Sequence, residues 1–171
     1  MIRFTLGIND CDNNVKVNHR VAVRAVILNG ENILLIKTNK GDYKFPGGGV
    51  KEGESHENAI IREVKEEAGY DVVKVNERVG EITQGKYDKM DKGSIFQMIS
   101  HYYFCEVSDN VGSQKLDEYE EVLGFCPVWV NIHTAIEANQ EVLKKEAKDI
   151  NPFVYRETAF LKELVKLNTS K

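Results

Sequence analysis

Three glutamates, Glu63, Glu66 and Glu67, are spaced so that a helix would bring their carboxylates together. Each helical residue turns by about 100°, so the three side chains share a sector of roughly 100°. Like charges three or four residues apart repel each other by a few tenths of a kcal/mol, and Lys65 points away from this sector. A hard divalent cation would relieve that repulsion. On these residues alone, a metal-binding helix and an acidic surface helix are equally good interpretations.

A glycine run stands just before this helix. Gly47, Gly48 and Gly49 follow a strand-like stretch, and glycine lets the backbone come close to a ligand. Ser55 is a suitable N-cap, and Gly69 suits the left-handed residue that ends many helices. A glycine loop alone is often only a tight turn, but one that leads into an acidic helix favours the metal-binding interpretation.

Together these residues resemble the Nudix box, G-x5-E-x7-R-E-U-x-E-E-x-G-U, in which U is a bulky aliphatic residue. All seven fixed positions are matched at their spacing. A chance match of this kind in such a chain is about one in a million, given ordinary residue frequencies. The direct resemblance covers residues 45–70, and the matching residues are Gly48, Glu54, Arg62, Glu63, Val64, Glu66, Glu67 and Gly69.

Two positions depart from the pattern. Tyr70 stands at the final aliphatic position, where the residue packs rather than reacts. Lys51 stands where a glutamate is often found, with Glu52 beside it. The second departure changes how a substrate or an extra metal ion is held, and it leaves the main ligands untouched.

The resemblance implies an α+β fold, in which a three-layer α/β/α sandwich surrounds a mixed β-sheet. It implies an enzyme that hydrolyses a pyrophosphate bond with Mg²⁺, or with Mn²⁺ as the alternative ion. Glu63, Glu66, Glu67 and the backbone carbonyl of Gly47 would then bind the metal.

The resemblance also implies roles for the other box residues. Arg62 would act in catalysis by orienting the glutamates, and it would pair with Glu54 across the box. Gly48 and Gly69 would shape the backbone at the two ends of the box. Such contacts matter because metal ligands are held in place by their neighbours.

The general base of the reaction comes, in this family, from the box or from a downstream loop. Glu118, Glu120 and Glu121 stand just before the last predicted strand, and Glu120 is the preferred candidate. A solvated acidic turn is the simpler interpretation of any one of them. Glu63 and Glu66 are the alternatives within the box.

The resemblance implies a small phosphorylated nucleotide as the substrate, with residues beyond the box selecting its second group. Branches that resemble ADP-ribose hydrolases carry a proline about sixteen residues after the box, and residues 85–87 contain none. Branches that resemble diadenosine polyphosphate hydrolases carry a tyrosine there, which Tyr87 matches. Lys86, with Lys89 and Lys92, would hold a phosphate chain while Tyr87 stacks on a base. This favours a dinucleoside polyphosphate or nucleoside triphosphate over ADP-ribose or a nucleotide sugar, although a plain loop tyrosine is the alternative.

Two other functions fit the same family. One is a Nudix domain that senses a nucleotide without turnover, but such a domain would be expected to lose box glutamates. The other is an isoprenoid diphosphate isomerase, but no cysteine stands near the box. Hydrolysis is therefore the preferred interpretation.

The elements that position the site follow from periodicity. The acidic helix also carries an apolar stripe, Ile60, Ile61, Val64 and Ala68, that predicts its buried side. Two more helices are predicted, one over Ile132–Ala147 and one from Asn151-Pro152. Strands are predicted at Val21–Leu28, Ile33–Lys37, Val72–Ile82, Ile95–Val107 and Val122–Val130, with a hairpin turn at Asn29–Gly30.

Length and composition restrict the remaining properties. The 171 residues predict one domain, 1–171, with a net charge of −4 that argues against binding a nucleic-acid polymer or an anionic membrane. No apolar stretch approaches the roughly 18 residues of a membrane helix. Cys11, Cys105 and Cys126 are odd in number and unpaired in spacing, which favours reduced thiols in a cytoplasm. A homodimer is the oligomeric alternative that remains open.

Overall fold

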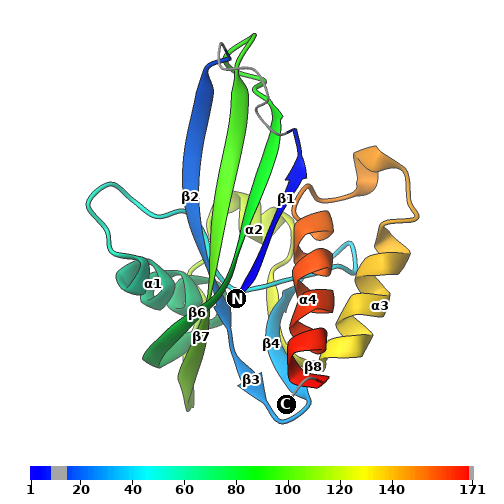
Figure 1. Cartoon of the computed structure of the whole chain (residues 1–171). Helices are drawn as coiled ribbons and strands as arrows, with labels where there is room; N and C mark the ends of the chain where they lie inside the picture. Colours follow the sequence, from blue (N-terminus) through cyan, green and yellow to red (C-terminus); the bar gives the residue numbers. More distant parts are fainter. Residues whose placement is uncertain (9–14, 170–171) are drawn as a thin grey trace.

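In the computed structural model, which describes residues 1–8 and 15–169, the strands form a central layer and the helices lie on both sides of it (Figure 1). The strands are β1 (Ile2–Gly7), β2 (Val17–Val26), β3 (Leu28–Asn29), β4 (Asn32–Lys37), β5 (Tyr43–Lys44), β6 (Tyr70–Tyr87), β7 (Ile95–Val111) and β8 (Cys126–Asn131). The helices are α1 (His56–Ala68), α2 (Glu118–Val122), α3 (Ile132–Val142) and α4 (Val154–Thr169), with a 3-10 turn at Ala147–Asp149.

The central layer consists of two sheets. The first has the order β1-β6-β7-β2 and is mixed, because β6 and β7 are antiparallel while β1 and β2 run parallel to their neighbours. The second is antiparallel, with β3, β5 and β8 all paired to β4. The sheets meet where the Leu34 N–H donates to the Ile27 carbonyl at 3.0 Å. The predicted mixed sheet is therefore confirmed in the first sheet, and the second, antiparallel sheet adjoins it.

Each face of this layer has its own apolar core. On one face Val23 and Leu34, from the two sheets, pack with Ile60 of α1. On the other face Tyr102 stacks on Phe160 of α4 at 3.5 Å between ring centroids. Burying each large side chain contributes about 1.5–3 kcal/mol to folding. The predicted α+β three-layer sandwich is confirmed.

The strands differ from the prediction mainly in length. β6 and β7 extend five and four residues beyond the predicted ends Ile82 and Val107, because they pair with each other up to Tyr87↔Ile95 and Tyr70↔Val111. β1 was not predicted, and it forms by parallel pairing with β6. These strands are stabilised by cross-strand partners that a local pattern does not reveal.

The predicted strand Val122–Val130 is wrong in its first half. The chain instead forms the short helix α2, because the Asp117 side chain accepts from the Glu120 N–H while the Glu120 side chain accepts from the Asp117 N–H. Gly124, at φ 63°, then turns the chain into β8. This reciprocal cap is the capping box, and it starts helices.

The C-terminal helices also differ from the prediction at their ends. α3 stops at Val142 rather than Ala147, because the Lys144 N–H donates to the Glu141 carbonyl three residues back. α4 begins at Val154, since the Asn151 side chain is used by Asp42 at 2.9 Å and does not cap the helix. Within the described residues, no helix is long and apolar enough to cross a membrane.

Helix α1 has defined ends. The Ser55 side chain accepts from the Asn58 N–H, and Gly69 ends the helix in the left-handed conformation at φ 75°. Ile60 and Val64 of the predicted apolar stripe are fully buried, whereas Ile61 is 40% exposed, so its placement in that stripe is wrong. These caps fix where the box glutamates lie along the helix axis.

The glycine loop runs along the free edge of β2. The Ala25 N–H donates to the Pro46 carbonyl, and the Val23 N–H donates to the Gly48 carbonyl, both at 2.9 Å. Gly47 adopts φ 140°, and a Cβ there would overlap the Val23 carbonyl oxygen. Only glycine therefore allows the loop to lie against the sheet at this position.

Candidate active site

Three carboxylates from two separate helices meet beside the glycine loop. One oxygen each from Glu63 and Glu67 on α1 and Glu120 on α2 lies within 4.8 Å of the others. Glu63 and Glu67 are 8% and 2% exposed, so this face of α1 is not an acidic surface face at these two residues. Glu66, also a predicted ligand, is outside this group.

Glu67 is held by the loop and by a lysine. One of its carboxylate oxygens accepts from the Gly47 N–H at 2.9 Å, and the other pairs with Lys44 Nζ at 2.5 Å. Lys44 also donates to the Gly47 carbonyl at 3.3 Å. Lys44 was not predicted as a site residue. Its signal was a lone lysine between Tyr43 and Phe45, in a strand too apolar for an unpaired charge.

Arg62 joins the carboxylates of the box. Its Nε and Nη2 atoms donate to the two oxygens of Glu54 at 2.8 and 2.9 Å. Its Nη1 atom donates to Glu63 at 2.5 Å and to Glu66 at 3.2 Å, and Nη2 also reaches the Gly49 carbonyl at 3.1 Å. Hydrogen bonds from Arg62 lower the pKa of Glu54 to about 2. One guanidinium thus orients three carboxylates.

Two box glycines are required by close approach. A Cβ on Gly48 would overlap the Glu63 carboxylate, and a Cβ on Gly69 would overlap the Gly112 carbonyl oxygen. The first contact lets the loop lie directly over α1. The second lets the segment after β7 fold back against the end of α1.

That returning segment positions Glu120. The Gly112 N–H donates to the Gly69 carbonyl and the Lys115 N–H to the Glu66 carbonyl, both at 2.8 Å. The Gln114 side chain donates to the Glu67 carbonyl at 2.5 Å. The chain then enters α2 through its capping box, which places Glu120 at the cluster. The other loop candidates, Glu118 and Glu121, are exposed and lie outside the carboxylate group.

Burial and the neighbouring charges shift the pKa values of two carboxyl groups in this cluster. Burial raises the pKa of Glu63, and the nearby charge of Glu67 adds to that shift while the bond from Arg62 opposes it. Burial also raises the pKa of Glu120 to about 7, with a further contribution from the Glu67 charge. The site therefore resists full ionisation unless more positive charge is present.

The donor set fits a hard divalent cation. Glu63, Glu67 and Glu120 offer oxygen atoms only, as Mg²⁺ and Mn²⁺ prefer, and the Gly47 carbonyl lies next to Glu67. No histidine or cysteine joins the group among the described residues. Of the cysteines, Cys105 is buried and Cys126 is exposed, and Cys11 lies outside the described residues.

A buried ionic network supports the loop from beneath. Glu157 of α4, which is 0% exposed, accepts from the Phe45 N–H at 3.2 Å. Arg156 pairs with Glu157 at 2.6 Å, and Arg24 of β2 lies 3.7 Å from it. Since Phe45 is two residues before Gly47, this network fixes the approach to the carboxylate cluster.

Lys86 and Tyr87 are not brought to the cluster. They end β6 as successive strand residues, so their side chains point to opposite faces of the sheet. Lys86 lies 5.4 Å from the Phe96 ring centroid. Phe96 is in register with Asn18 of β2. Asn18 lies four residues before Ala22, the residue that forms a bridge to Gly49, so these two positions are about 13 Å apart along the strand. Both residues, Lys86 and Tyr87, therefore stand in a strand rather than in a loop, and their contacts with a phosphate chain and a base stay a prediction.

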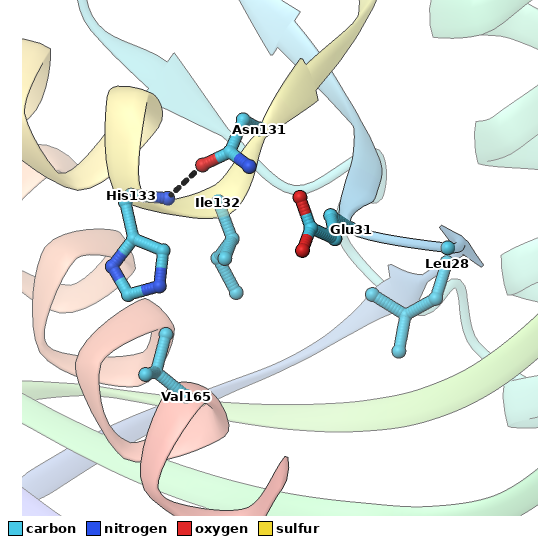
Figure 2. Close-up of a pocket in the computed structure, with 7 residues that line it drawn as sticks. Leu28, Glu31, Asn131, Ile132, His133 and Val165 are labelled. Atoms are coloured by element: carbon cyan, nitrogen blue, oxygen red, sulfur yellow. Dashed lines mark hydrogen bonds between the residues drawn. The ribbon is translucent and has the colours of Figure 1, made fainter. Parts of the chain in front are cut away.

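A separate pocket of about 290 Å³ lies between β8, α3 and α4. Figure 2 shows Glu31, Ile132 and His133 gathered around it. No residue of α1 or of the glycine loop lines it, so it does not belong to the carboxylate site.

Comparison with known proteins gives this site its context. The NUDIX domain model matches residues 18–154. A NUDIX hydrolase from Nitrosomonas europaea superposes with a TM-score of 0.54 at 23% identity, covering 87% of this chain and 91% of the other. A MutT NUDIX hydrolase from Burkholderia pseudomallei gives a TM-score of 0.50 at 20% identity, covering 68% and 85% of the two chains. These two structures show a shared fold.

Two curated relatives match over shorter stretches. An RNA pyrophosphohydrolase of Campylobacter jejuni subsp. doylei is 38% identical over 34% of this chain and 42% of its own. An ADP-ribose pyrophosphatase of Methanocaldococcus jannaschii is 36% identical over 46% of this chain and 47% of its own. The matched stretch thus spans less than half the length of each relative. The box, the fold and the domain match agree, and this chain belongs to the Nudix family.

The raised pKa of Glu120 gives a testable pH dependence. Burial raises the pKa of Glu120 from the ordinary value of 4.5, which applies to the unfolded chain, to about 7 in the folded protein. The folded state therefore keeps this contribution to its stability below pH 4.5 and loses it as the pH rises through 7. Glu120→Gln removes this loss and keeps an oxygen that can accept from Asp117. In excess chelator, we expect the variant to melt at a higher temperature than the wild type at pH 8, with a gap that shrinks towards pH 5.

Scanning calorimetry across this pH range measures the gap. Glu121→Gln, on the same short helix but outside the cluster, is the matched control and should melt with the wild type at every pH. A gap that stays constant with pH would show that Glu120 is not destabilised by its surroundings.

Proposed function

We propose that this protein hydrolyses a pyrophosphate bond in a nucleotide, with Mg²⁺ as the natural ion and Mn²⁺ as a substitute. One observation carries the proposal: Glu63, Glu67 and Glu120 converge within 4.8 Å beside the glycine loop. Such a site concentrates negative charge where an anionic substrate has to bind. A divalent cation would allow the anionic substrate to bind beside these carboxylates, since it neutralises phosphate oxygens. It also stabilises the leaving phosphate and lowers the pKa of bound water.

In this proposal, the box residues hold the ion and keep it oriented. Glu63, Glu66 and Glu67 supply carboxylate oxygens, and the Gly47 backbone supplies its carbonyl. Glu66 is now shared with Arg62 at 3.2 Å and would turn from the guanidinium towards the ion. Arg62 remains bound to Glu54, whose lowered pKa keeps that carboxylate charged.

Glu120 is proposed as the general base that accepts a proton from the attacking water. A pKa of about 7 suits that role, because such a group is partly deprotonated at neutral pH and still takes up a proton readily. It stands on α2, a different helix from the proposed metal ligands of α1, and one of its carboxylate oxygens lies within 4.8 Å of those of Glu63 and Glu67. Glu63 and Glu66 are the alternatives if the base lies within the box.

The alternatives to hydrolysis are weaker. A nucleotide-sensing domain without turnover has no need for three converging carboxylates, and none of the box glutamates is missing here. An isoprenoid diphosphate isomerase would need an acid–base cysteine at its site. Burial raises the pKa of the Cys105 thiol to about 12, which makes it unsuited to that chemistry.

We further propose that residues 1–171 form a single Nudix domain. Two elements that lie at or beyond the ends of the matched region 18–154 pack on the same core. β1 pairs with β6 along its length, and α4 contributes Phe160, Leu161 and Leu164. A cytoplasmic location, reduced thiols and a homodimer remain expectations from the sequence.

The proposed substrate is a nucleotide with an extended polyphosphate, either a dinucleoside polyphosphate or a nucleoside triphosphate. The names of the relatives point in two directions, to RNA and to ADP-ribose. The net charge of −4 argues against a polymer, which leaves a small nucleotide as the preferred class. Lys86 lies on the uncovered end of β6, where it could contact the far end of a long substrate.

Activity is expected to require a divalent metal at the box glutamates. Excess EDTA should abolish turnover, and Glu66→Gln and Glu67→Gln should each lower it by about two orders of magnitude or more, since each removes a charged ligand. Steady-state phosphate release measures the effect. Glu57→Gln, an exposed change in the first turn of α1, is the control. Because Glu67 is buried, circular dichroism has to show that its variant is folded. Full activity in excess EDTA would contradict the proposal.

Glu120 is expected to act on the rate rather than on metal binding. Glu120→Gln should lower kcat by about 10²- to 10⁴-fold, the usual contribution of a general base, while the Kd for Mn²⁺ changes less than threefold. Electron paramagnetic resonance measures the Kd. Glu118→Gln and Glu121→Gln are matched controls with exposed side chains. If Mn²⁺ binds much more weakly to Glu120→Gln, then Glu120 is a ligand. If all three variants keep their rates, the base lies in the box.

A panel of substrates tests the specificity. With Mg²⁺ present, kcat/KM should be highest for a dinucleoside polyphosphate or a nucleoside triphosphate. ADP-ribose, a nucleotide sugar and a short 5′-triphosphate RNA complete the panel, and chromatography identifies the products. Much faster turnover of any of these three would overturn the substrate preference and leave the hydrolase assignment standing.

A further inference from the structure

Lys44 contacts two of the groups that are proposed to bind the metal. Its ammonium pairs with a Glu67 oxygen at 2.5 Å and donates to the Gly47 carbonyl at 3.3 Å. Both groups are metal donors in the proposed function, on which this inference rests. A lysine thus already occupies the oxygen atoms that a divalent ion would use.

The surroundings of Lys44 keep it there. Its residue is 4% exposed, and Nζ lies 4.6 Å from the Phe125 ring centroid, where the ring face attracts a cation. Burial raises the pKa of Glu63 and of Glu120, and the charge of Lys44 opposes part of that rise at both carboxylates. Without Lys44, the buried carboxylate of Glu67 would keep only the Gly47 N–H at 2.9 Å.

The two cations of the site divide its carboxylates. Arg62 bonds to Glu63, Glu66 and Glu54, and Lys44 bonds to Glu67. Arg62 is a partly exposed side chain of α1, whereas Lys44 is a buried side chain of β5. A divalent ion needs ligand oxygens at about 2.0–2.1 Å if it is Mg²⁺, and an ammonium on the same oxygens would lie within a few ångströms of it. Two cations that close repel each other strongly in a buried site.

We propose that Lys44 is the internal counter-cation of the metal site. It holds Glu67 and the Gly47 carbonyl in place when no metal is bound, and it gives up the Gly47 carbonyl and one Glu67 oxygen when a divalent ion enters. Lys44 is therefore a positioning residue that competes with the metal. Lys44 weakens metal binding, and it keeps the site stable and ordered when no metal is bound.

The experiment compares the Kd for Mn²⁺ in the wild type and in Lys44→Met by electron paramagnetic resonance. Removing the competing charge should tighten Mn²⁺ binding at least tenfold. Lys44→Gln, which keeps a hydrogen-bond donor without the charge, should tighten it in the same direction and serves if the methionine variant does not fold. Lys65→Met is the matched control, because Lys65 lies on α1 but pairs with Asp71 at 2.8 Å. Its Kd should stay within twofold of the wild type.

Thermal melting gives an independent readout. In excess EDTA, Lys44→Met should melt below the wild type, because Glu67 loses its buried partner. Saturating Mg²⁺ should then raise its melting temperature by more than it raises that of the wild type. If the wild type binds Mn²⁺ and both Lys44 variants bind it equally well or more weakly, the proposed role of Lys44 is overturned and the metal site is not. Absence of Mn²⁺ binding in the wild type would overturn the metal site itself.

Discussion

Repulsion among three close carboxylates is the constraint on which the rest of this structure depends. One carboxylate oxygen from each of Glu63, Glu67 and Glu120 lies within 4.8 Å of the others, and the first two residues are almost fully buried. Such a group is unstable unless cations surround it. Arg62 and Lys44 supply part of the positive charge, and a divalent ion is proposed to supply the rest. In the proposed function, this remaining negative charge is what attracts the metal.

The fold keeps these groups together against that repulsion through backbone contacts. The glycine loop lies on the edge of β2 and reaches Glu67 through the Gly47 N–H. The segment after β7 bonds to the last carbonyls of α1 and so delivers Glu120. Beneath the loop, Glu157 of α4 bonds to the Phe45 N–H. Elements from both ends of the chain therefore meet at one small site, which explains why a short sequence motif needs a whole domain around it.

The sequence predicted the parts of the site that depend on local spacing. Glu63, Glu67 and Arg62 follow from helical geometry and the box, and Glu120 from its place before the last strand. Lys44 escaped because its role arises from a strand, a loop and a helix that only the fold brings together. Lys86 and Tyr87 are adjacent in sequence, and the strand that contains them, which depends on long-range pairing, sends their side chains to opposite faces. The second sheet and the full length of β6 and β7 depended on long-range pairing, which leaves little local pattern.

The most direct measurement is the anomalous diffraction of a crystal of the wild-type protein soaked in Mn²⁺. The predicted result is a manganese ion within bonding distance of the Glu63 and Glu67 carboxylates, with the Lys44 ammonium moved away from the Gly47 carbonyl. A crystal that takes up manganese at other residues while Glu63, Glu67 and Glu120 keep their metal-free contacts would contradict a metal site built on these carboxylates.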